Sequence, residues 1–138
     1  MTRRPHVLGG LVLLTLSWSA ACGGPSPPPR PRVSAARQAG SWQGSGSRTV
    51  GDVASESGHL RIRWQTARES PAGAGTFRLT VRSAVSGRPL QVVVDRRGEG
   101  AGTIDFQDTP RAYDFLVESD HVEWSFTVEE VYDAYGRE

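Results

Sequence analysis

Hydrophobic and polar residues alternate with a period of two along much of the chain beyond residue 58. This alternation is typical of strands that bury one face and expose the other. Four segments show it clearly and are predicted as strands: 60–64, 77–81, 113–117 and 122–128. Three weaker segments, 48–53, 90–95 and 103–106, lie between turn-prone clusters of Gly, Pro and Ser and bring the predicted total to seven strands.

Seven short strands separated by turns predict an all-β fold, a single small antiparallel β-sandwich of the jelly-roll or immunoglobulin-like type. No segment keeps a helical period, so no helix is expected beyond a turn near Asp133. Trp64 and Trp124 occupy inward positions of two predicted strands. We expect them to meet across the two sheets at the centre of the core.

Residues 1–21 have the organisation of a signal peptide. Arg3 and Arg4 form a basic start, an apolar stretch covers 7–18, and the small residues Ser19, Ala20 and Ala21 precede Cys22. About 12 apolar residues are too few for a transmembrane helix, which needs about 20.

The motif Ser19-Ala20-Ala21-Cys22 resembles the lipobox of bacterial lipoproteins, with Ser19 in place of the usual Leu. The resemblance implies that Cys22 is acylated with diacylglycerol, carrying fatty acids such as palmitate, after the signal peptide is cleaved. The protein would then be extracytoplasmic and anchored to a bacterial cell membrane or outer membrane. Ordinary secretion, with Cys22 left as a free thiol, is the alternative.

Residues 22–46 are rich in Gly, Pro and Ser and contain few apolar side chains. They are predicted to be a disordered tether between the lipidated Cys22 and a sandwich domain at 47–135. The segments around Trp42, 59–64, 75–81 and 124–128 resemble small β-sandwich domains of hypothetical bacterial lipoproteins, and more distantly carbohydrate-binding jelly rolls. These resemblances imply a fold but carry over no catalytic residue and no ligand.

Charge is unevenly distributed along the chain. The net charge of +1 argues against nucleic-acid binding. Residues 1–97 hold 14 Arg and 4 acidic residues, whereas residues 98–138 hold 2 Arg and 11 acidic residues. The arginines at positions Arg61, Arg63, Arg78 and Arg82 either pair with acidic neighbours or form a basic face that binds an anionic glycan or lipid headgroups.

Candidate chemistry is sparse. The chain has no Lys, its single Cys belongs to the leader, and His59 and His121 lie in no known catalytic motif. We predict no catalytic residue, no metal ligand and no cofactor. Trp42 is a candidate platform for a sugar ring, although a place in the core is the alternative. Convergence of Asp105, Asp108 and Asp114 would instead favour a calcium-dependent or hydrolytic enzyme.

The sequence therefore predicts a lipid-anchored, non-enzymatic binding module. Its expected partners are membrane lipid, through Cys22, and an unidentified envelope protein or glycan. A purely structural envelope protein is the third hypothesis.

Overall fold

The computed structural model describes residues 23–28 and 32–135, so the predicted signal peptide and Cys22 lie outside the described residues. The described domain consists of eight β-strands. They are β1 (Arg32–Ser45), β2 (Arg48–Ser55), β3 (His59–Ala67), β4 (Thr76–Ser83), β5 (Pro89–Arg97), β6 (Gly100–Gln107), β7 (Arg111–Asp120) and β8 (Glu123–Tyr135). Within these ranges, no helix of a length and hydropathy that would cross a bilayer is found.

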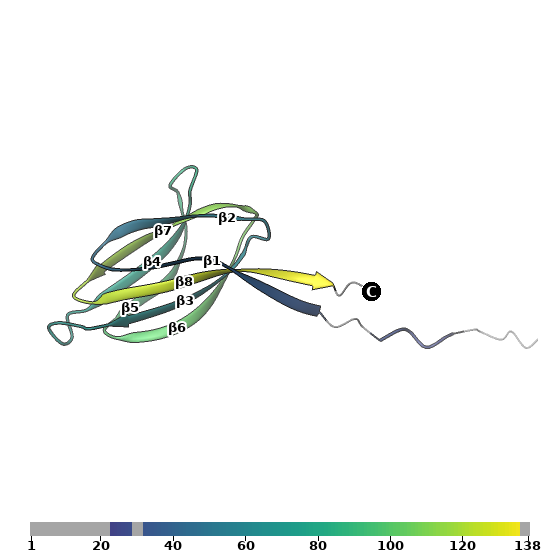
Figure 1. Cartoon of the computed structure of the whole chain (residues 1–138), viewed down its shortest axis with the longest axis horizontal. Coiled ribbons are helices and arrows are strands. Elements are labelled where there is room, and N and C mark those ends of the chain that lie inside the picture. Colours follow the sequence, from purple (N-terminus) through teal and green to yellow (C-terminus); the bar gives the residue numbers. More distant parts are fainter. Residues whose placement is uncertain (1–22, 29–31, 136–138) are drawn as a thin grey trace, which may run out of the picture.

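The strands form two four-stranded antiparallel sheets. Sheet A has the order β1-β8-β3-β6 and sheet B the order β2-β7-β4-β5 (Figure 1). The first strand pairs with the eighth, the second with the seventh, the third with the sixth, and the fourth with the fifth. The chain is thus one long hairpin wound into two sheets, which is the strand order of a jelly roll. The predicted all-β sandwich is confirmed.

The prediction of a tether up to residue 46 is wrong for residues 32–45, which form β1. This strand pairs with β8 from Arg32 opposite Tyr135 to Ser45 opposite Glu123, with a bulge at Ala39. Its composition resembles that of a linker because most of its side chains are small. Backbone hydrogen bonds to β8 nevertheless order it, since strand pairing does not require large side chains. The domain begins at Arg32 rather than at residue 47.

The four strands predicted from clear alternation and the three weaker candidates are all present, and most are longer than expected. The prediction of a turn near Asp133 is wrong, because β8 continues to Tyr135 and remains paired with β1.

The core lies between the inner faces of the two sheets. Phe77 of β4 is fully buried, and its ring stacks on Trp64 at 5.9 Å and on Trp124 at 6.5 Å between centroids. Trp64 and Trp124 belong to the neighbouring strands β3 and β8 of sheet A, so the expectation that they face each other across the sheets is wrong. Alternation identifies the inward face of a strand, but it does not say which sheet contains the strand.

Strands β1 and β8 extend beyond the rest of the sandwich. The pairing of β3 with β8 ends at Leu60 opposite Glu130, whereas β1 and β8 continue as a two-stranded ribbon to Tyr135 (Figure 1). We call this the ribbon end of the domain. Because the strands alternate in direction, the loops β1–β2, β3–β4, β5–β6 and β7–β8 lie at the opposite end, which we call the far end.

Replacement of the central ring tests this description of the core. Phe77→Ala is expected to lower the free energy of unfolding by about 3–5 kcal/mol, because it removes a buried ring between two indoles. Val85→Ala, at a loop residue that is 90% exposed, should change it by less than about 0.5 kcal/mol. Urea denaturation of both variants measures the difference, and equal stabilities would contradict the packing.

Candidate functional site

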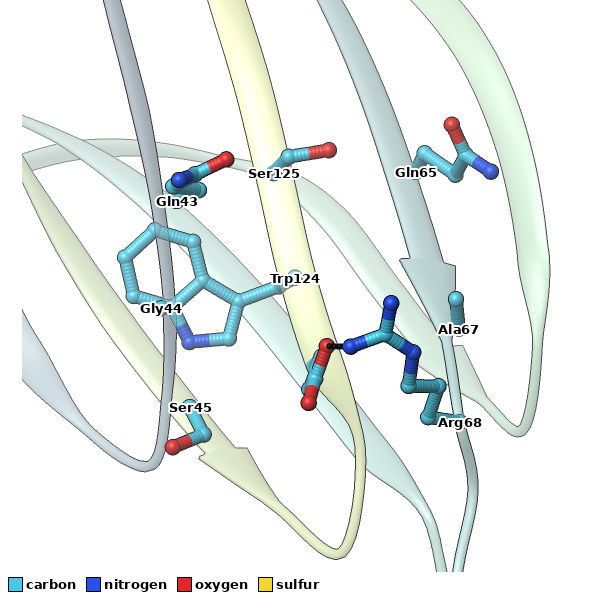
Figure 2. Close-up of a pocket in the computed structure, with 9 residues that line it drawn as sticks. Gln43, Gly44, Ser45, Gln65, Ala67, Arg68, Trp124 and Ser125 are labelled. Atoms are coloured by element: carbon cyan, nitrogen blue, oxygen red, sulfur yellow. Dashed lines mark hydrogen bonds and ion pairs between the residues drawn. The ribbon is translucent and has the colours of Figure 1, made fainter.

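An open hollow of about 500 Å3 lies on the outer face of sheet A towards the far end (Figure 2). Three uncharged polar side chains cross it in a row. Gln43 of β1 lies opposite Ser125 of β8, and Ser125 lies opposite Gln65 of β3. Adjacent strands are about 4.8 Å apart, so the two glutamines are separated by about 10 Å. This row is composed of amides and a hydroxyl, which both donate and accept hydrogen bonds.

Differences in side-chain length make the surface concave. Gly44, Ser45 and Ala67 are small, whereas Arg68 and Glu123 rise beside them and form an ion pair of 2.7 Å between Nη1 and Oε2 (Figure 2).

The sheet beneath the hollow is held by Trp124, which is 2% exposed and whose Nε1 donates a 2.9 Å hydrogen bond to the Gly46 carbonyl. A Cβ on Gly44 would lie 3.1 Å from this indole, so a glycine keeps β1 close to it. The indole supports the floor of the hollow from inside and is too buried to stack on a ligand.

The four arginines singled out from the sequence lie on two opposite faces. Arg61 and Arg63 are on the outer face of sheet A, and Arg78 and Arg82 on the outer face of sheet B. Each pairs with a carboxylate on a neighbouring strand. The pairs are Arg61–Asp105 at 3.0 Å, Arg63–Glu129 at 3.3 Å, Arg78–Asp95 at 3.0 Å and Arg82–Asp114 at 2.7 Å. The interpretation as one basic face is wrong, because acidic strands flank the arginine-bearing strands within each sheet.

Trp42 lies on the inner side of β1. Its ring packs at 5.7 Å from Phe115 and 5.3 Å from Phe126, and it is part of the packing around the core. It is not the exposed platform that one hypothesis required.

The carboxylates Asp105, Asp108 and Asp114 do not converge. Asp105 belongs to sheet A, Asp114 belongs to sheet B, and Asp108 lies in the loop after β6 with an ion pair to Arg111. Within the described ranges, no group of three or more potential ligands could hold a metal ion. The convergence that the hypothesis of a calcium-dependent or hydrolytic enzyme required is therefore contradicted for these three residues.

Known proteins give no further guide to this surface. No family model, curated protein or solved structure matches the chain. Function must therefore be argued from the residues themselves.

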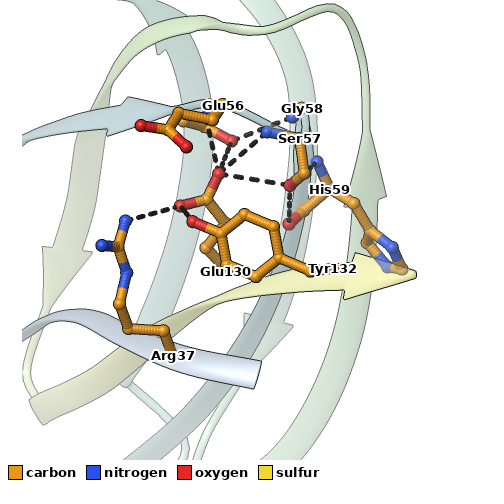
Figure 3. A network of polar contacts seen from close by, with 8 residues as sticks. Arg37, Glu56, Ser57, Gly58, His59, Glu130 and Tyr132 are labelled. Atoms are coloured by element: carbon orange, nitrogen blue, oxygen red, sulfur yellow. Dashed lines mark hydrogen bonds and ion pairs between the residues drawn. The ribbon is translucent and has the colours of Figure 1, made fainter. Parts of the chain in front are cut away.

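A residue that sequence reasoning missed, Glu130, forms the most extensive polar network in the described domain (Figure 3). Its side chain is fully buried at the ribbon end. Oε1 accepts hydrogen bonds from Ser55 Oγ at 2.9 Å, from the backbone N–H of Glu56 at 2.6 Å, and from the backbone N–H of Ser57 at 2.9 Å. Oε2 accepts from Arg37 at 3.0 Å and from the Tyr132 hydroxyl.

The network holds Glu130 in its charged form. Burial by itself raises the pKa of this carboxyl, but the donors from Tyr132, Ser57, Ser55 and Glu56 favour the carboxylate more strongly. Together they lower the pKa from 4.5 to about 2. Such a group does not exchange protons near neutral pH, so it is unsuited to acid–base catalysis and instead fixes the crossover from β2 to β3.

The lowered pKa predicts an acid dependence of stability. Because the folded pKa is below the unfolded one, the stabilisation is complete above pH 4.5 and is lost as pH falls towards 2. Between pH 5 and 2.5, Glu130 should account for a loss of about 2–3 kcal/mol in the free energy of unfolding.

Urea denaturation at both pH values, with Glu130→Gln and the exposed-site control Glu118→Gln, measures this contribution. The first variant should be less stable at pH 5 and less sensitive to acid, while the control should follow the wild type. A Glu130→Gln protein with the acid sensitivity of the wild type would contradict the assignment.

Proposed function

We propose that this protein is a lipid-anchored, extracytoplasmic binding module whose hollow on sheet A binds an uncharged glycan. The observation that carries the proposal is the row of Gln43, Ser125 and Gln65, which offers donors and acceptors across about 10 Å of the hollow. Hydroxyl groups of sugars both donate and accept hydrogen bonds, as amides and serine hydroxyls do. A ligand of one charge would gain little, because the adjacent Arg68 and Glu123 neutralise each other.

The position of the hollow supports an anchored role. Both ends of the described domain are in the ribbon formed by β1 and β8, while the hollow lies towards the far end. A tether that joins the ribbon to a membrane would leave the hollow on the side directed away from that membrane. From Cys22 to Arg32 the chain has ten residue steps, which reach about 31 Å when extended as polyproline II.

The hollow suits binding better than catalysis. Nucleophilic catalysis requires a nucleophile with a base within hydrogen-bond distance. Ser45 and Ser125 line the hollow, but no lining side chain is a histidine that could act as their base, and none is a cysteine. The lining also has a single carboxylate, Glu123, which is engaged with Arg68. A general acid and base in the manner of glycosidases would require two.

The binding proposal is tested with a panel of neutral and acidic oligosaccharides and the full-length protein. A neutral oligosaccharide should bind, and Gln43→Ala and Gln65→Ala should each weaken it by about three- to tenfold, the cost of one lost hydrogen bond. Gln107→Ala, on the same sheet near the ribbon end, is the matched control and should leave binding unchanged. Absence of binding across the panel, or equal loss in the control, would refute the glycan hypothesis.

The anchor is tested by intact-mass analysis of the protein purified from its native host. A chain that starts at Cys22 and carries the mass of diacylglycerol is the expected result, and Cys22→Ala should abolish it. An unlipidated chain cleaved at another position would mean that the domain is secreted without an anchor.

A further inference from the structure

The four edge strands of the sandwich differ in how well they are protected against pairing with another strand. An edge strand presents unpaired backbone N–H and C=O groups, and bulges or prolines commonly block them. Pairing is interrupted in β1 between Gln38 and Gly40, in β2 between Val50 and Val53, and at two places in the pairing of β5, which also begins with Pro89.

Strand β6 has none of these features. All eight of its residues pair in uninterrupted register with β3, from Gly100 opposite Thr66 to Gln107 opposite His59. Its other side pairs with no described strand, and it forms the margin of sheet A (Figure 1). Its one charged side chain, Asp105, is held over the sheet by Arg61. The backbone of β6 is therefore accessible and regular.

The inner side of this edge is partly open and carries a cation. Trp64 and Ile104 are half-buried there, whereas the other inward hydrophobic residues of β3, Leu60 and Ile62, are fully buried. Arg96 of β5 lies over the Trp64 ring, with its Cζ 5.9 Å from the centroid. Among the described residues, no carboxylate forms an ion pair with Arg96, in contrast to the arginines at the centres of the sheets.

Glycines create this arrangement. A Cβ on Gly102 would come within 2.9 Å of Trp64 Nε1, and a Cβ on Gly100 within 3.2 Å of the Arg96 guanidinium. Side chains at these two positions would push the indole and the guanidinium away from β6. The edge thus combines an accessible backbone, an apolar strip and an unpaired positive charge.

We propose that β6 binds an extended acidic peptide segment of a partner protein as a ninth strand, separate from the hollow. The peptide backbone would pair with β6, an apolar side chain would cover Trp64 and Ile104, and a carboxylate two residues away would meet Arg96. Alternate residues of a strand face the same side, so this spacing follows from strand geometry.

The charge of the edge favours an acidic peptide over a second copy of this chain. The inward positions of β6 are Gly100, Gly102, Ile104 and Phe106, and none is acidic. Pairing of β6 with β6 of another copy would therefore leave Arg96 without a carboxylate from that strand.

The probe for the test is the capped heptapeptide Thr-Val-Thr-Glu-Thr-Val-Thr, which has the same sequence in both directions. Added to the isotope-labelled full-length protein, it should shift the amide resonances of residues 100–107 and leave β1 and β2 unchanged. Arg96→Gln should weaken binding by about three- to fivefold, as expected for one partly exposed ion pair. Arg97→Gln is the matched control, because Arg97 lies opposite Thr76 on the outer face of sheet B.

Two further peptides separate strand addition from simple attraction. Replacing Glu by Gln in the peptide should cost the same factor as Arg96→Gln, and combining both changes should cost no more. A peptide methylated on all of its backbone nitrogens should not bind, because neither of its edges can then donate hydrogen bonds to β6. Absence of binding by the first peptide, equal binding of the methylated peptide, or resonance shifts confined to the hollow would overturn the proposal. Dimerisation through β6 in sedimentation equilibrium without peptide would assign the edge to a second copy and overturn it as well.

Discussion

Every strand pair of the sandwich joins one of the first four strands to one of the last four. Neither half of the chain can therefore complete a sheet alone. The same pairing offsets the uneven charge, because five of the six strand pairs join the arginine-rich residues 1–97 to the acidic residues 98–138. Arg63 meets Glu129 and Arg82 meets Asp114 on adjacent strands. A charge asymmetry that is large along the chain is cancelled within each sheet, so neither outer face becomes strongly basic or acidic.

Glu130 fixes one of the places where the chain crosses between the sheets, the turn from β2 to β3. A buried carboxylate is costly unless it is hydrogen-bonded and paired with a cation. Here Arg37 from β1, the turn after β2 and Tyr132 from β8 all meet the same carboxylate. The base of the ribbon is thereby joined to both sheets.

The sequence was sufficient to predict seven strands and the all-β class, because burial of one face imposes alternation on four of them and turn-prone clusters delimit the other three. It was insufficient for β1, whose inward positions include Gly40 and Gly44 beside Trp42. Glycine has a low strand propensity, so these positions do not predict a strand by themselves. Pairing with β8 orders them as one. Glu130 could have been found by extending the alternation past Val128, since it occupies the next inward position.

Sheet order and the hollow could not be found in this way. Alternation shows which face of a strand each residue occupies, but it does not show which strand lies beside it. Gln43, Gln65 and Ser125 are far apart in sequence, and they form one row only through the register of β1, β8 and β3.

The surface chemistry limits how any partner can be recognised. Val85 and Val92 are the exposed large hydrophobic residues of the described domain, and they are separate positions rather than a broad apolar patch. Recognition by burial of a large apolar surface is therefore disfavoured. What remains are directional contacts, made by amides and hydroxyls in the hollow and by backbone groups along β6. Both proposed sites depend on strand register more than on apolar area, since the apolar strip at β6 is limited to Trp64 and Ile104. The same jelly-roll pairing that neutralises the charges of the sheets also positions the groups proposed to bind.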